Sequence, residues 1–389
     1  MKIHRFEKGD TVDLVAKKYG ITADVLRIYN DIGKSSPTVG EELVILTPTR
    51  TYKTRVNDTL ERISLRFSVK KNKLISINPG INEGALPVGR ELSLKFSDAC
   101  YGTALANGYF YKGCSEKKLC AVLPYLTYIT FSVAEFDGKE INVSDFQKKS
   151  LKLSLDSGKI PLIRIYEKNK SDKYRSPDVF IDECIRVSEE YGFKGITLNL
   201  EDEESNERAC EFLIKMRKRL IGSDLILITE INDKSISDFT DYSDGSVICY
   251  PKLAMQDAPS FDLGERAVYS SFATKGESAK AFIDLPTLAR RNDSFYDIEG
   301  VMERARGSRG EILHDEEKKL SYAKIRNDEY VFTPLSNIKA ILDMVYEYGY
   351  MGISFDIMRI PLSYLYMYGA IFSTMAYNGI IEHSSCLDG

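Results

Sequence analysis

Several carboxylate and tyrosine side chains stand where short, β-rich segments in the second half of the chain end. If these segments form a parallel sheet, their last residues meet at one edge or mouth of that sheet. The candidate residues at these positions are Glu135, Glu167, Glu201, Glu230, Tyr250, Asp284 and Asp356. Paired carboxylates in such a place can act as general acid and base, although a solvated rim charge is the simpler interpretation for several of them.

Histidine and cysteine offer little other chemistry. The three histidines, His4, His314 and His383, are scattered and unsuited to a His-based metal site or a Ser-His-Asp triad. The seven cysteines are an odd number without a CxxC pair, which argues against a disulfide framework and a structural zinc site. We therefore expect no metal and no cofactor, and any catalysis here has to be carboxylate chemistry.

The composition is that of a globular protein without a nucleic-acid or membrane partner. The chain has 389 residues, 43% of them hydrophobic, and its net charge of -4 comes from 53 basic and 57 acidic residues. Such a balance does not favour binding to a phosphate backbone or an anionic membrane. The N-terminal MKIHRFEKGDT has no apolar signal core, and no run approaches the roughly 18 apolar residues of a membrane span. We expect synthesis in the cytoplasm without a signal peptide.

The elements that must position the candidate residues alternate between β-rich segments and amphipathic helices. The eight segments cover residues 108–113, 127–136, 160–167, 195–201, 224–232, 246–252, 281–286 and 352–358. Eight such units predict an α/β fold, a closed (β/α)8 barrel over residues 105–389, with a doubly wound open sheet as the main alternative. Residues from about 293 to 334 have their own polar, strand-like pattern and predict an inserted α+β lobe.

The first 97 residues contain a tandem repeat. Asp10-Thr11 and Asp58-Thr59 recur at an offset of 48, as do Asn30 and Asn78. Each copy reads as strand, helix, helix and strand, which predicts two small βααβ domains at 1–48 and 49–97. Asp10 and Asp58 are expected to cap the helix that follows each of them.

Both copies resemble the LysM module, in the order and spacing of the strand, the Asp-Thr pair, the late Asn and the Gly before the last strand. The resemblance implies binding of N-acetylglucosamine-containing polymers such as peptidoglycan or chitin. It places the glycan-binding residues in two loops of each copy, at Asp10, Thr11, Asn30, Asp31 and Ile32, and at Asp58, Thr59, Asn78, Pro79 and Gly80. Taken singly, Asp10, Asp58, Asn30 and Asn78 are better explained as helix caps and turn formers.

The segment GFKGITLNLE at 192–201 is similar to the DGxDxDxE signature of family 18 glycoside hydrolases, with Gly195 and Glu201 matching. The segments 106–113, 122–138 and 349–364 further resemble the LysM-bearing N-acetylglucosaminidases that act on the spore cortex of endospore-forming bacteria. This resemblance implies a TIM barrel, a cell-wall glycan as partner, and spore-layer proteins as further partners. It also implies synthesis in the mother cell followed by deposition in the spore cortex or coat, or in a Gram-positive cell wall.

The resemblance assigns roles that the residues fulfil only in part. The acid of the family falls on Glu201, and Tyr250 would contact the substrate's acetamide group. The Asp that supports this acetamide is replaced by Asn199, the other two acidic positions are Thr197 and Lys194, and a pocket-floor Trp aligns with Asp356. An amide can donate and accept hydrogen bonds but carries no negative charge.

The sequence therefore favours a peptidoglycan-directed protein with a barrel whose hydrolase activity is weakened or lost. The first alternative is an active N-acetylglucosaminidase with Glu201 as the acid and the substrate's own acetamide as the nucleophile. A second alternative pairs Glu201 with Glu230 or Asp356 in conventional acid/base hydrolysis.

Overall fold

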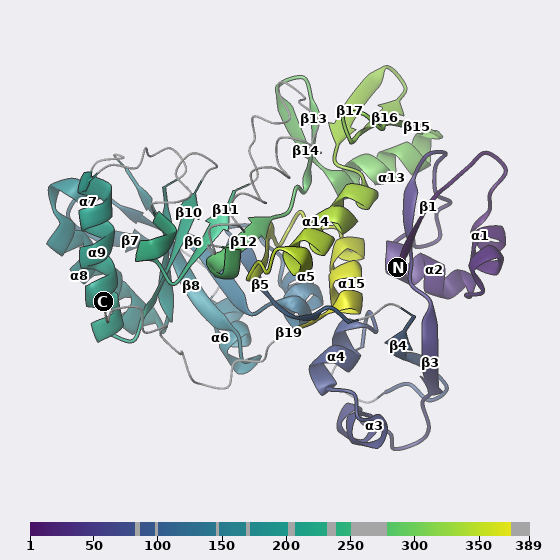
Figure 1. The fold of residues 1–389 in the computed structure, drawn as a ribbon, viewed down its shortest axis with the longest axis horizontal. Coiled ribbons are helices and arrows are strands. Elements are labelled where there is room, and N and C mark those ends of the chain that lie inside the picture. Colours follow the sequence, from purple (N-terminus) through teal and green to yellow (C-terminus); the bar gives the residue numbers. More distant parts are fainter. Residues whose placement is uncertain are drawn as a thin grey trace.

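The computed structural model describes residues 1–81, 86–97, 100–144, 148–168, 172–200, 207–231, 239–249 and 278–374. Two small N-terminal domains lie beside a barrel, and an α+β lobe lies above the barrel and next to the first small domain (Figure 1). In the described part of the chain, no helix combines the length and the apolar character needed to cross a membrane.

Eight parallel strands close into a barrel, as the sequence predicts. Their order around the barrel is β5-β6-β8-β9-β10-β11-β12-β18, and β18 pairs again with β5. The strands are β5 (Gly102–Tyr111), β6 (Tyr128–Phe136), β8 (Ile160–Glu167), β9 (Gly195–Asn199), β10 (Ile226–Ile231), β11 (Gly245–Ile248), β12 (Ala281–Asp284) and β18 (Gly352–Asp356). Closure through the β5–β6 and β18–β5 pairings rules out the doubly wound open sheet.

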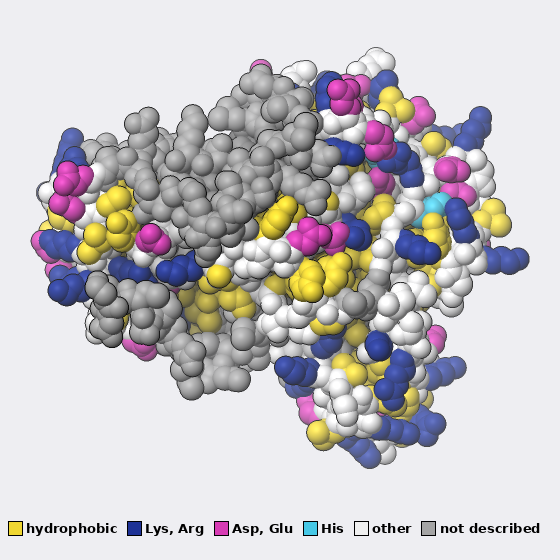
Figure 2. All heavy atoms as spheres, in the orientation of Figure 1, with side chains coloured by type: hydrophobic (Ala, Val, Ile, Leu, Met, Phe, Trp, Pro, Cys, Tyr) yellow, Lys and Arg dark blue, Asp and Glu magenta, His cyan; other side chains and the backbone are white. Residues whose placement is uncertain are grey.

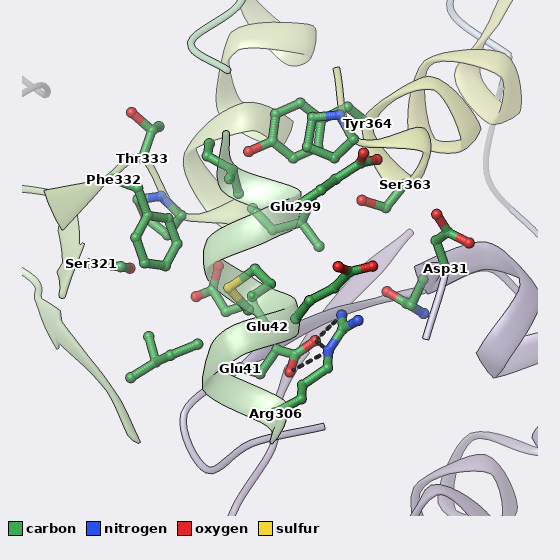
Figure 3. Close-up of a pocket in the computed structure, with 18 of the residues that line it drawn as sticks. Asp31, Glu41, Glu42, Glu299, Arg306, Ser321, Phe332, Thr333, Ser363 and Tyr364 are labelled. Atoms are coloured by element: carbon green, nitrogen blue, oxygen red, sulfur yellow. Dashed lines mark hydrogen bonds and ion pairs between the residues drawn. The ribbon is translucent and has the colours of Figure 1, made fainter. Parts of the chain in front are cut away.

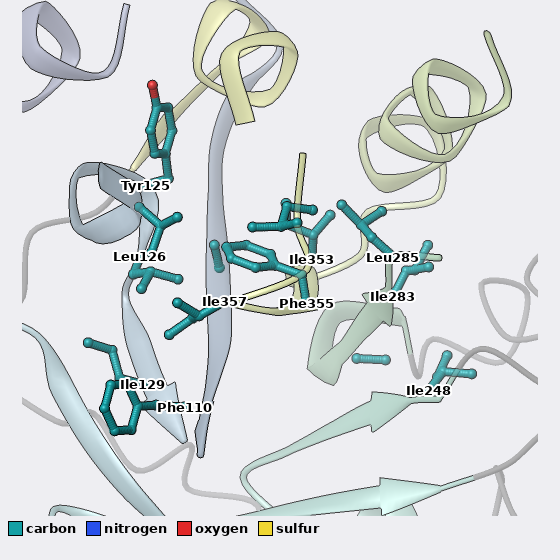
Figure 4. Close-up of a cluster of buried hydrophobic side chains, with 14 of the residues drawn as sticks. Phe110, Tyr125, Leu126, Ile129, Ile248, Ile283, Leu285, Ile353, Phe355 and Ile357 are labelled. Atoms are coloured by element: carbon teal, nitrogen blue, oxygen red, sulfur yellow. The ribbon is translucent and has the colours of Figure 1, made fainter. Parts of the chain in front are cut away.

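Helices cover the outside of the barrel. They are α5 (Glu116–Val122), α6 (Lys148–Asp156), α7 (Asp172–Arg175), α8 (Pro177–Tyr191), α9 (Glu207–Gly222), α14 (Leu335–Glu347) and α15 (Leu362–Ile371). Short strands β7 (Ile141–Val143) and β19 (Phe372–Thr374) add to β6 and β5. Buried side chains such as Phe110, Ile129, Ile353 and Phe355 fill the space between strands and helices (Figure 4).

The alternation of side chains along each strand sets what faces the barrel interior. At the amino-terminal ends of the strands, a separate apolar cluster fills the interior and includes Leu162, Ile228, Val247 and Phe282. Because side chains on one face recur at every second residue, the next inward positions on these strands lie nearer the carboxyl ends. Those positions hold Arg164, Glu230, Cys249 and Asp284, so the interior changes from apolar to polar toward the mouth.

The inserted lobe lies between β12 and α14. Its antiparallel sheet has the order β14-β13-β17-β16-β15 and is covered by α13 (Ile298–Ser308). The strands are β13 (Leu288–Arg291), β14 (Ser294–Asp297), β15 (Glu311–Asp315), β16 (Leu320–Ile325) and β17 (Asp328–Phe332). A small core that includes Ala289, Val301, Ile312 and Ala323 holds the helix against the sheet.

Each N-terminal repeat has the expected βααβ order. The first contains β1 (Lys2–Arg5), α1 (Val12–Tyr19), α2 (Ala23–Asn30) and β2 (Glu42–Ile45); the second contains β3 (Pro48–Lys53), α3 (Leu60–Phe67), α4 (Lys71–Ser76) and β4 (Glu91–Phe96). In each repeat the two strands pair with each other in antiparallel fashion.

The expected capping by Asp10 and Asp58 is wrong. The N-caps are Thr11 and Thr59, whose hydroxyls accept from the amide three residues further on at 3.2 Å. The threonine is the residue with extended backbone directly before the helix, so only its side chain reaches that amide. The aspartates instead close the preceding turn, and each accepts from the amide three residues before it, at 2.9 Å for Asp10 and 2.7 Å for Asp58.

The first repeat is joined to the lobe through the loop before β2. Val39 forms a parallel bridge with Glu311, and the Ile312 amide donates to the Val39 carbonyl at 2.9 Å. Gly40 is required in this position, because a β-carbon on it would lie 1.9 Å from the Ile312 carbonyl oxygen and because its φ is +85°. The backbones of residues 39–40 and 311–312 thus lie in direct contact, with no room for a side chain at position 40.

The second repeat is anchored on the barrel. Lys73 of α4 donates to the carbonyls of Gly369, Ala370 and Phe372 at 2.5, 3.3 and 2.8 Å, where α15 ends. An ammonium group at a helix carboxyl terminus satisfies free carbonyls and complements the helix dipole. Tyr29 links the two repeats, since its hydroxyl donates to the Ile77 carbonyl at 2.8 Å.

Candidate functional site

A buried polar cluster lies at the carboxyl ends of strands β8, β9 and β10. The Glu230 side chain is 1% exposed, and its Oε2 accepts from Arg164 Nε at 2.8 Å and from Arg164 Nη2 at 2.5 Å. The same oxygen accepts from Asn199 Nδ2 at 2.9 Å. Asn199 thus presents its amide group to a carboxylate, and that carboxylate is already neutralised by a guanidinium.

Two polar atoms of this cluster have no hydrogen-bond partner among the described residues. They are Glu230 Oε1 and the Tyr109 hydroxyl, and both are buried. Burial raises the pKa of the Tyr109 phenol well above its ordinary value, and the Glu230 carboxylate adds to this effect. The Arg164 guanidinium lies 5.9 Å from the Tyr109 ring centroid and 4.5 Å from that of Tyr166. Unpaired buried groups of this kind are uncommon in folded proteins and often mark a functional site or an ordered water.

Two further positions of the signature-like segment, Thr197 and Lys194, carry no charge into the barrel. Thr197 is fully buried, and its hydroxyl lies 3.4 Å from that of Thr130, which donates to Asn107 Oδ1 at 2.9 Å. Lys194 is exposed before strand β9. At positions 197 and 199 this barrel has neutral hydroxyl and amide groups that form hydrogen bonds.

Asp356 lies at the end of β18 and is held by its surroundings. The Tyr111 hydroxyl donates to its Oδ2 at 2.5 Å, and the backbone amide of Met358 donates to its Oδ1 at 2.9 Å. Burial raises the pKa of Asp356, while the Tyr111 hydrogen bond and the Arg359 cation oppose the shift. A carboxyl group with a raised pKa at the rim of a barrel can hold a proton, although here its acceptor sites are occupied.

A cleft of about 490 Å³ separates this rim from the lobe. Tyr111 and Met358 line it from the barrel side, and Phe295, Tyr296 and Arg304 line it from the lobe. Phe295 is 42% exposed, so its ring is free to be covered by a ligand. Exposed aromatic rings beside polar groups suit the flat apolar face of a sugar ring.

The predicted site residues divide into three groups. Glu201 and Tyr250 lie outside the described residues. Asn199 and Glu230 are brought into direct contact, and Asp356 lies in a separate hydrogen-bonded group with Tyr111. Arg164 was not among the candidates. Its signal is present in the sequence, because it is the only charged residue before Glu167 in the otherwise apolar segment IPLIRIYE and shares the inward face with Ile160 and Leu162.

Asn30 and Asn78 are buried at 7% and 5% exposure and stabilise their repeats. Asn30 donates to the Leu26 and Val44 carbonyls at 2.9 Å and accepts from the Val44 amide at 2.6 Å. Asn78 does the same with Leu74 and Ser93. These bonds tie the second helix of each repeat to its last strand, which supports a structural role for both asparagines.

The other glycan-binding candidates differ in their exposure. Ile32 is 3% exposed and belongs to the core of the first repeat. Thr11, Asp31, Thr59 and Gly80 are exposed. Three candidates are partly exposed: Asp10, which bonds to His4 Nε2 at 2.9 Å, Asp58, which accepts from the Tyr52 hydroxyl at 2.7 Å, and Pro79, whose carbonyl accepts from Arg90 at 2.6 Å. The residues available to a ligand are therefore those of the loops and not the buried asparagines.

A second cavity, of about 110 Å³, lies between the first repeat, the lobe and α15 (Figure 3). Its carboxylates are largely engaged in contacts between domains. In the wall of the cavity, Glu41 and Arg306 form an ion pair with a shortest distance of 2.6 Å between Oε1 and Nη2 (Figure 3). Glu42 accepts from the Ser336 amide at 2.8 Å, and Glu299 pairs with Lys118 at 3.0 Å. The ion pairs and hydrogen bonds around this cavity form a seam between the domains and fix their relative positions.

Comparisons with known proteins agree with this architecture. The sequence model of the LysM domain family matches residues 4–46 and 52–95, so the two repeats are LysM domains. A protein of Bacillus subtilis (strain 168) named as a sporulation-specific glycosylase, YdhD, is 30% identical over 94 residues. These residues make up 24% of this chain and span only 22% of that relative's length.

Solved structures show the fold of the remainder. The spore cortex-lytic enzyme SleL of Bacillus cereus is 19% identical, with a TM-score of 0.72 over 97% of this chain and 99% of that one. The GH18 chitinase of Cycas revoluta is 14% identical, with a TM-score of 0.58 over 69% of this chain and 99% of that one. The barrel has the fold of family 18 glycoside hydrolases, and LysM domains precede it.

Proposed function

We propose that this chain binds N-acetylglucosamine-containing glycan of the bacterial cell wall through its LysM domains and presents it to a barrel whose hydrolase activity is weakened or lost. The observation that carries the second part is the hydrogen bond from Asn199 to Glu230, with Arg164 as the counter-ion of that carboxylate. Position 199, which would support the acetamide of the substrate, therefore carries a neutral amide in place of a carboxylate.

The argument is electrostatic. In substrate-assisted hydrolysis of N-acetylglucosamine polymers, positive charge develops on the acetamide as it attacks the sugar carbon. A carboxylate beside it stabilises this charge, whereas an amide offers a hydrogen bond of about half the strength. Asn199 already donates one of its amide hydrogens to the Glu230 carboxylate, and it carries no charge of its own. The absence of a negative charge at position 199 should lower the rate of hydrolysis roughly a hundredfold to a thousandfold.

The alternative function is an active N-acetylglucosaminidase with Glu201 as the acid. The cleft between barrel and lobe favours it, because Tyr111, Phe295 and Tyr296 provide surfaces for sugar rings. The likeness to SleL, named as spore cortex-lytic, extends over nearly the whole chain. Pairing Glu201 with Glu230 is disfavoured, because Glu230 is committed to Arg164, and pairing with Asp356 would need its bonds from Tyr111 and the backbone to be released.

The cellular setting is also part of the proposal. The names of the Bacillus subtilis relative and of SleL refer to sporulation and to the spore cortex. We propose deposition of this protein in the spore cortex or coat, with spore-layer proteins as its neighbours there. Fractionation of sporulating cells with an antibody against the chain tests this, and recovery only from the soluble fraction of vegetative cells would contradict it.

The experiment for the barrel uses the full-length protein on purified cortex fragments. Wild type, Glu201→Gln and the matched control Glu211→Gln, an exposed glutamate on α9, are compared for sugar release and for binding of N-acetylglucosamine oligosaccharides. We expect retained binding by all three and release far slower than that of a barrel with an intact signature. Brisk release by wild type and Glu211→Gln that is abolished in Glu201→Gln would establish the alternative.

A further inference from the structure

Charge is distributed very unevenly between the two LysM domains. Residues 1–48 contain seven basic and seven acidic side chains, whereas residues 49–97 contain ten basic and four acidic ones. The rest of the chain is acidic, with 36 basic and 46 acidic residues. In the space-filling view, Lys and Arg side chains gather over the second LysM domain (Figure 2). One module thus has a strong positive charge in a protein that is negative overall.

Internal contacts account for some of these cations. Lys73 donates to the carbonyls at the end of α15, on the outside of the barrel. Lys71 pairs with Glu61 at 2.7 Å, and Arg62 donates to the Asn57 carbonyl at 3.0 Å. Arg90 holds the loop carbonyls of residues 79 and 80. These four side chains help to build the domain or attach it to the barrel.

Four other cations are exposed, and we call them together the cationic face: Arg50, Lys53, Arg55 and Arg66. Within the described ranges, none of the four forms an ion pair with a carboxylate. Arg50 and Arg66 lie over the Phe67 ring at 5.0 and 5.4 Å from its centroid. Arg66 also donates one hydrogen bond, from Nη1 to the Tyr52 hydroxyl at 3.5 Å. Stacking on an aromatic ring restricts a guanidinium while leaving most of its donors available, which prepares it for an anion.

The cationic face continues to the loops where LysM domains are expected to hold glycan. Arg55 belongs to the loop between β3 and α3, and Lys53 passes beside Gly89, with its Cε 3.7 Å from where a β-carbon on that glycine would lie. Val56 and Val88 lie next in sequence to these positions and are 71% and 64% exposed. Apolar side chains for a sugar ring and cations for its substituents are therefore combined at one edge of the domain.

We propose that the cationic face binds carboxylates carried by the glycan, so that the second LysM domain selects an acidic polymer such as peptidoglycan over neutral chitin. The inference rests on the proposed glycan-binding function and names the class of glycan. Unpaired like charges at close range destabilise a folded domain, and a polyanionic partner relieves this repulsion.

The test measures binding of the full-length protein to three insoluble polymers. The first is peptidoglycan freed of phosphate-containing polymers by hydrofluoric acid, the second is the same material after its carboxylates are coupled to glycinamide with carbodiimide, and the third is chitin. We expect binding to the amidated material and to chitin to be about tenfold weaker at low ionic strength, as several exposed ion pairs would give. Raising the salt should narrow this difference because exposed charges are screened.

Variants link the preference to the cationic face. Lys53→Gln/Arg55→Gln should lose most of the preference for the acidic polymer while keeping its binding to chitin. The charge-preserving Lys53→Arg/Arg55→Lys should retain the preference, as should Lys17→Gln/Lys18→Gln, which alters two exposed cations on α1 of the first domain.

The outcomes separate this inference from the proposed function. Equal binding to all three polymers overturns the inference and leaves glycan binding by the LysM domains intact. Absence of binding to any of the three polymers removes the proposed function, and the inference with it.

Discussion

The reciprocal exchange of Asn199→Asp with Glu230→Gln tests why the barrel is expected to be a poor catalyst. In the structure, Asn199 Nδ2 donates to Glu230 Oε2 at 2.9 Å, and Arg164 donates to the same oxygen. The exchange reverses the direction of this hydrogen bond and moves the negative charge from β10 to β9, where family 18 enzymes are expected to hold it. Net charge and side-chain volumes are nearly unchanged.

The distance between Asn199 Nδ2 and Glu230 Oε2 gives the size of the electrostatic repulsion in the single variant Asn199→Asp. Asn199→Asp alone places two carboxylates about 2.9 Å apart. Their repulsion is about 6 kcal/mol at an effective dielectric constant of about 20, before Arg164 and relaxation offset part of it. We therefore expect Asn199→Asp to be destabilised by several kcal/mol or to retain a shared proton. In the double exchange this repulsion is absent, but a glutamine NH2 that donates to the new aspartate also faces Arg164, which donated to the same atom in wild type. Arg164 then has to pair with the aspartate instead, so the stability should lie between those of Asn199→Asp and wild type.

Activity is measured by sugar release from purified cortex fragments, and stability by denaturant unfolding. The double exchange should raise turnover roughly a hundredfold to a thousandfold, because one well-placed charge is worth that much in an acetamide-assisted reaction. Asn199→Asp alone should gain less, and Glu230→Gln alone should gain nothing. A folded double exchange with no gain in rate would refute the reasoning, since the charge at this position would then not be what limits hydrolysis.

Three further predictions concern stability, all measured by denaturant unfolding. Asn78→Ala removes three buried hydrogen bonds, two of them with Ser93, and should cost about 2–4 kcal/mol; a cost below about 1 kcal/mol would contradict its structural role. Glu41→Gln breaks the buried pair with Arg306 and should cost about 3 kcal/mol and expose the seam to proteolysis, so an unchanged digestion pattern would argue against it. Burial lowers the pKa of Lys159 from 10.5 to about 8. Between these pH values the unfolded chain binds more protons than the folded protein, so the free energy of unfolding rises with pH. Relative to Lys159→Met, wild type should therefore gain up to about 3 kcal/mol of stability as the pH rises through this interval. A difference independent of pH would contradict the shift.

Local patterns in the sequence predicted most of the secondary structure. The eight barrel segments and the two βααβ repeats follow from hydrophobic periodicity and turn residues, which act over a few neighbouring positions. The misassigned caps show the limit of such reasoning. Asp10 and Thr11 are adjacent and both are good N-caps, so only the backbone conformation of Thr11 decides which of them caps the helix.

The chemistry of the barrel mouth depended on contacts between distant segments. Asn199 was identifiable as a neutral replacement from its place in the signature-like segment. Its partner Glu230 is 31 residues away, and Arg164 is 66 residues from Glu230. Which inward side chains meet at the mouth is set by strand register and barrel closure, and neither property is encoded in one stretch of residues.

The sequence by itself determined the two repeats, the barrel and the loss of acidic residues from the signature-like segment, because each of these is a local pattern of residue types. Only the tertiary structure decided that Asn30 and Asn78 are consumed by internal hydrogen bonds, and that Gly40 lies against Ile312, a residue far along the chain. It also decided that Arg50 and Arg66 share one aromatic ring. A hydrogen bond or a close backbone approach depends on positions in space to a fraction of an ångström, and these positions arise only when all the elements pack together.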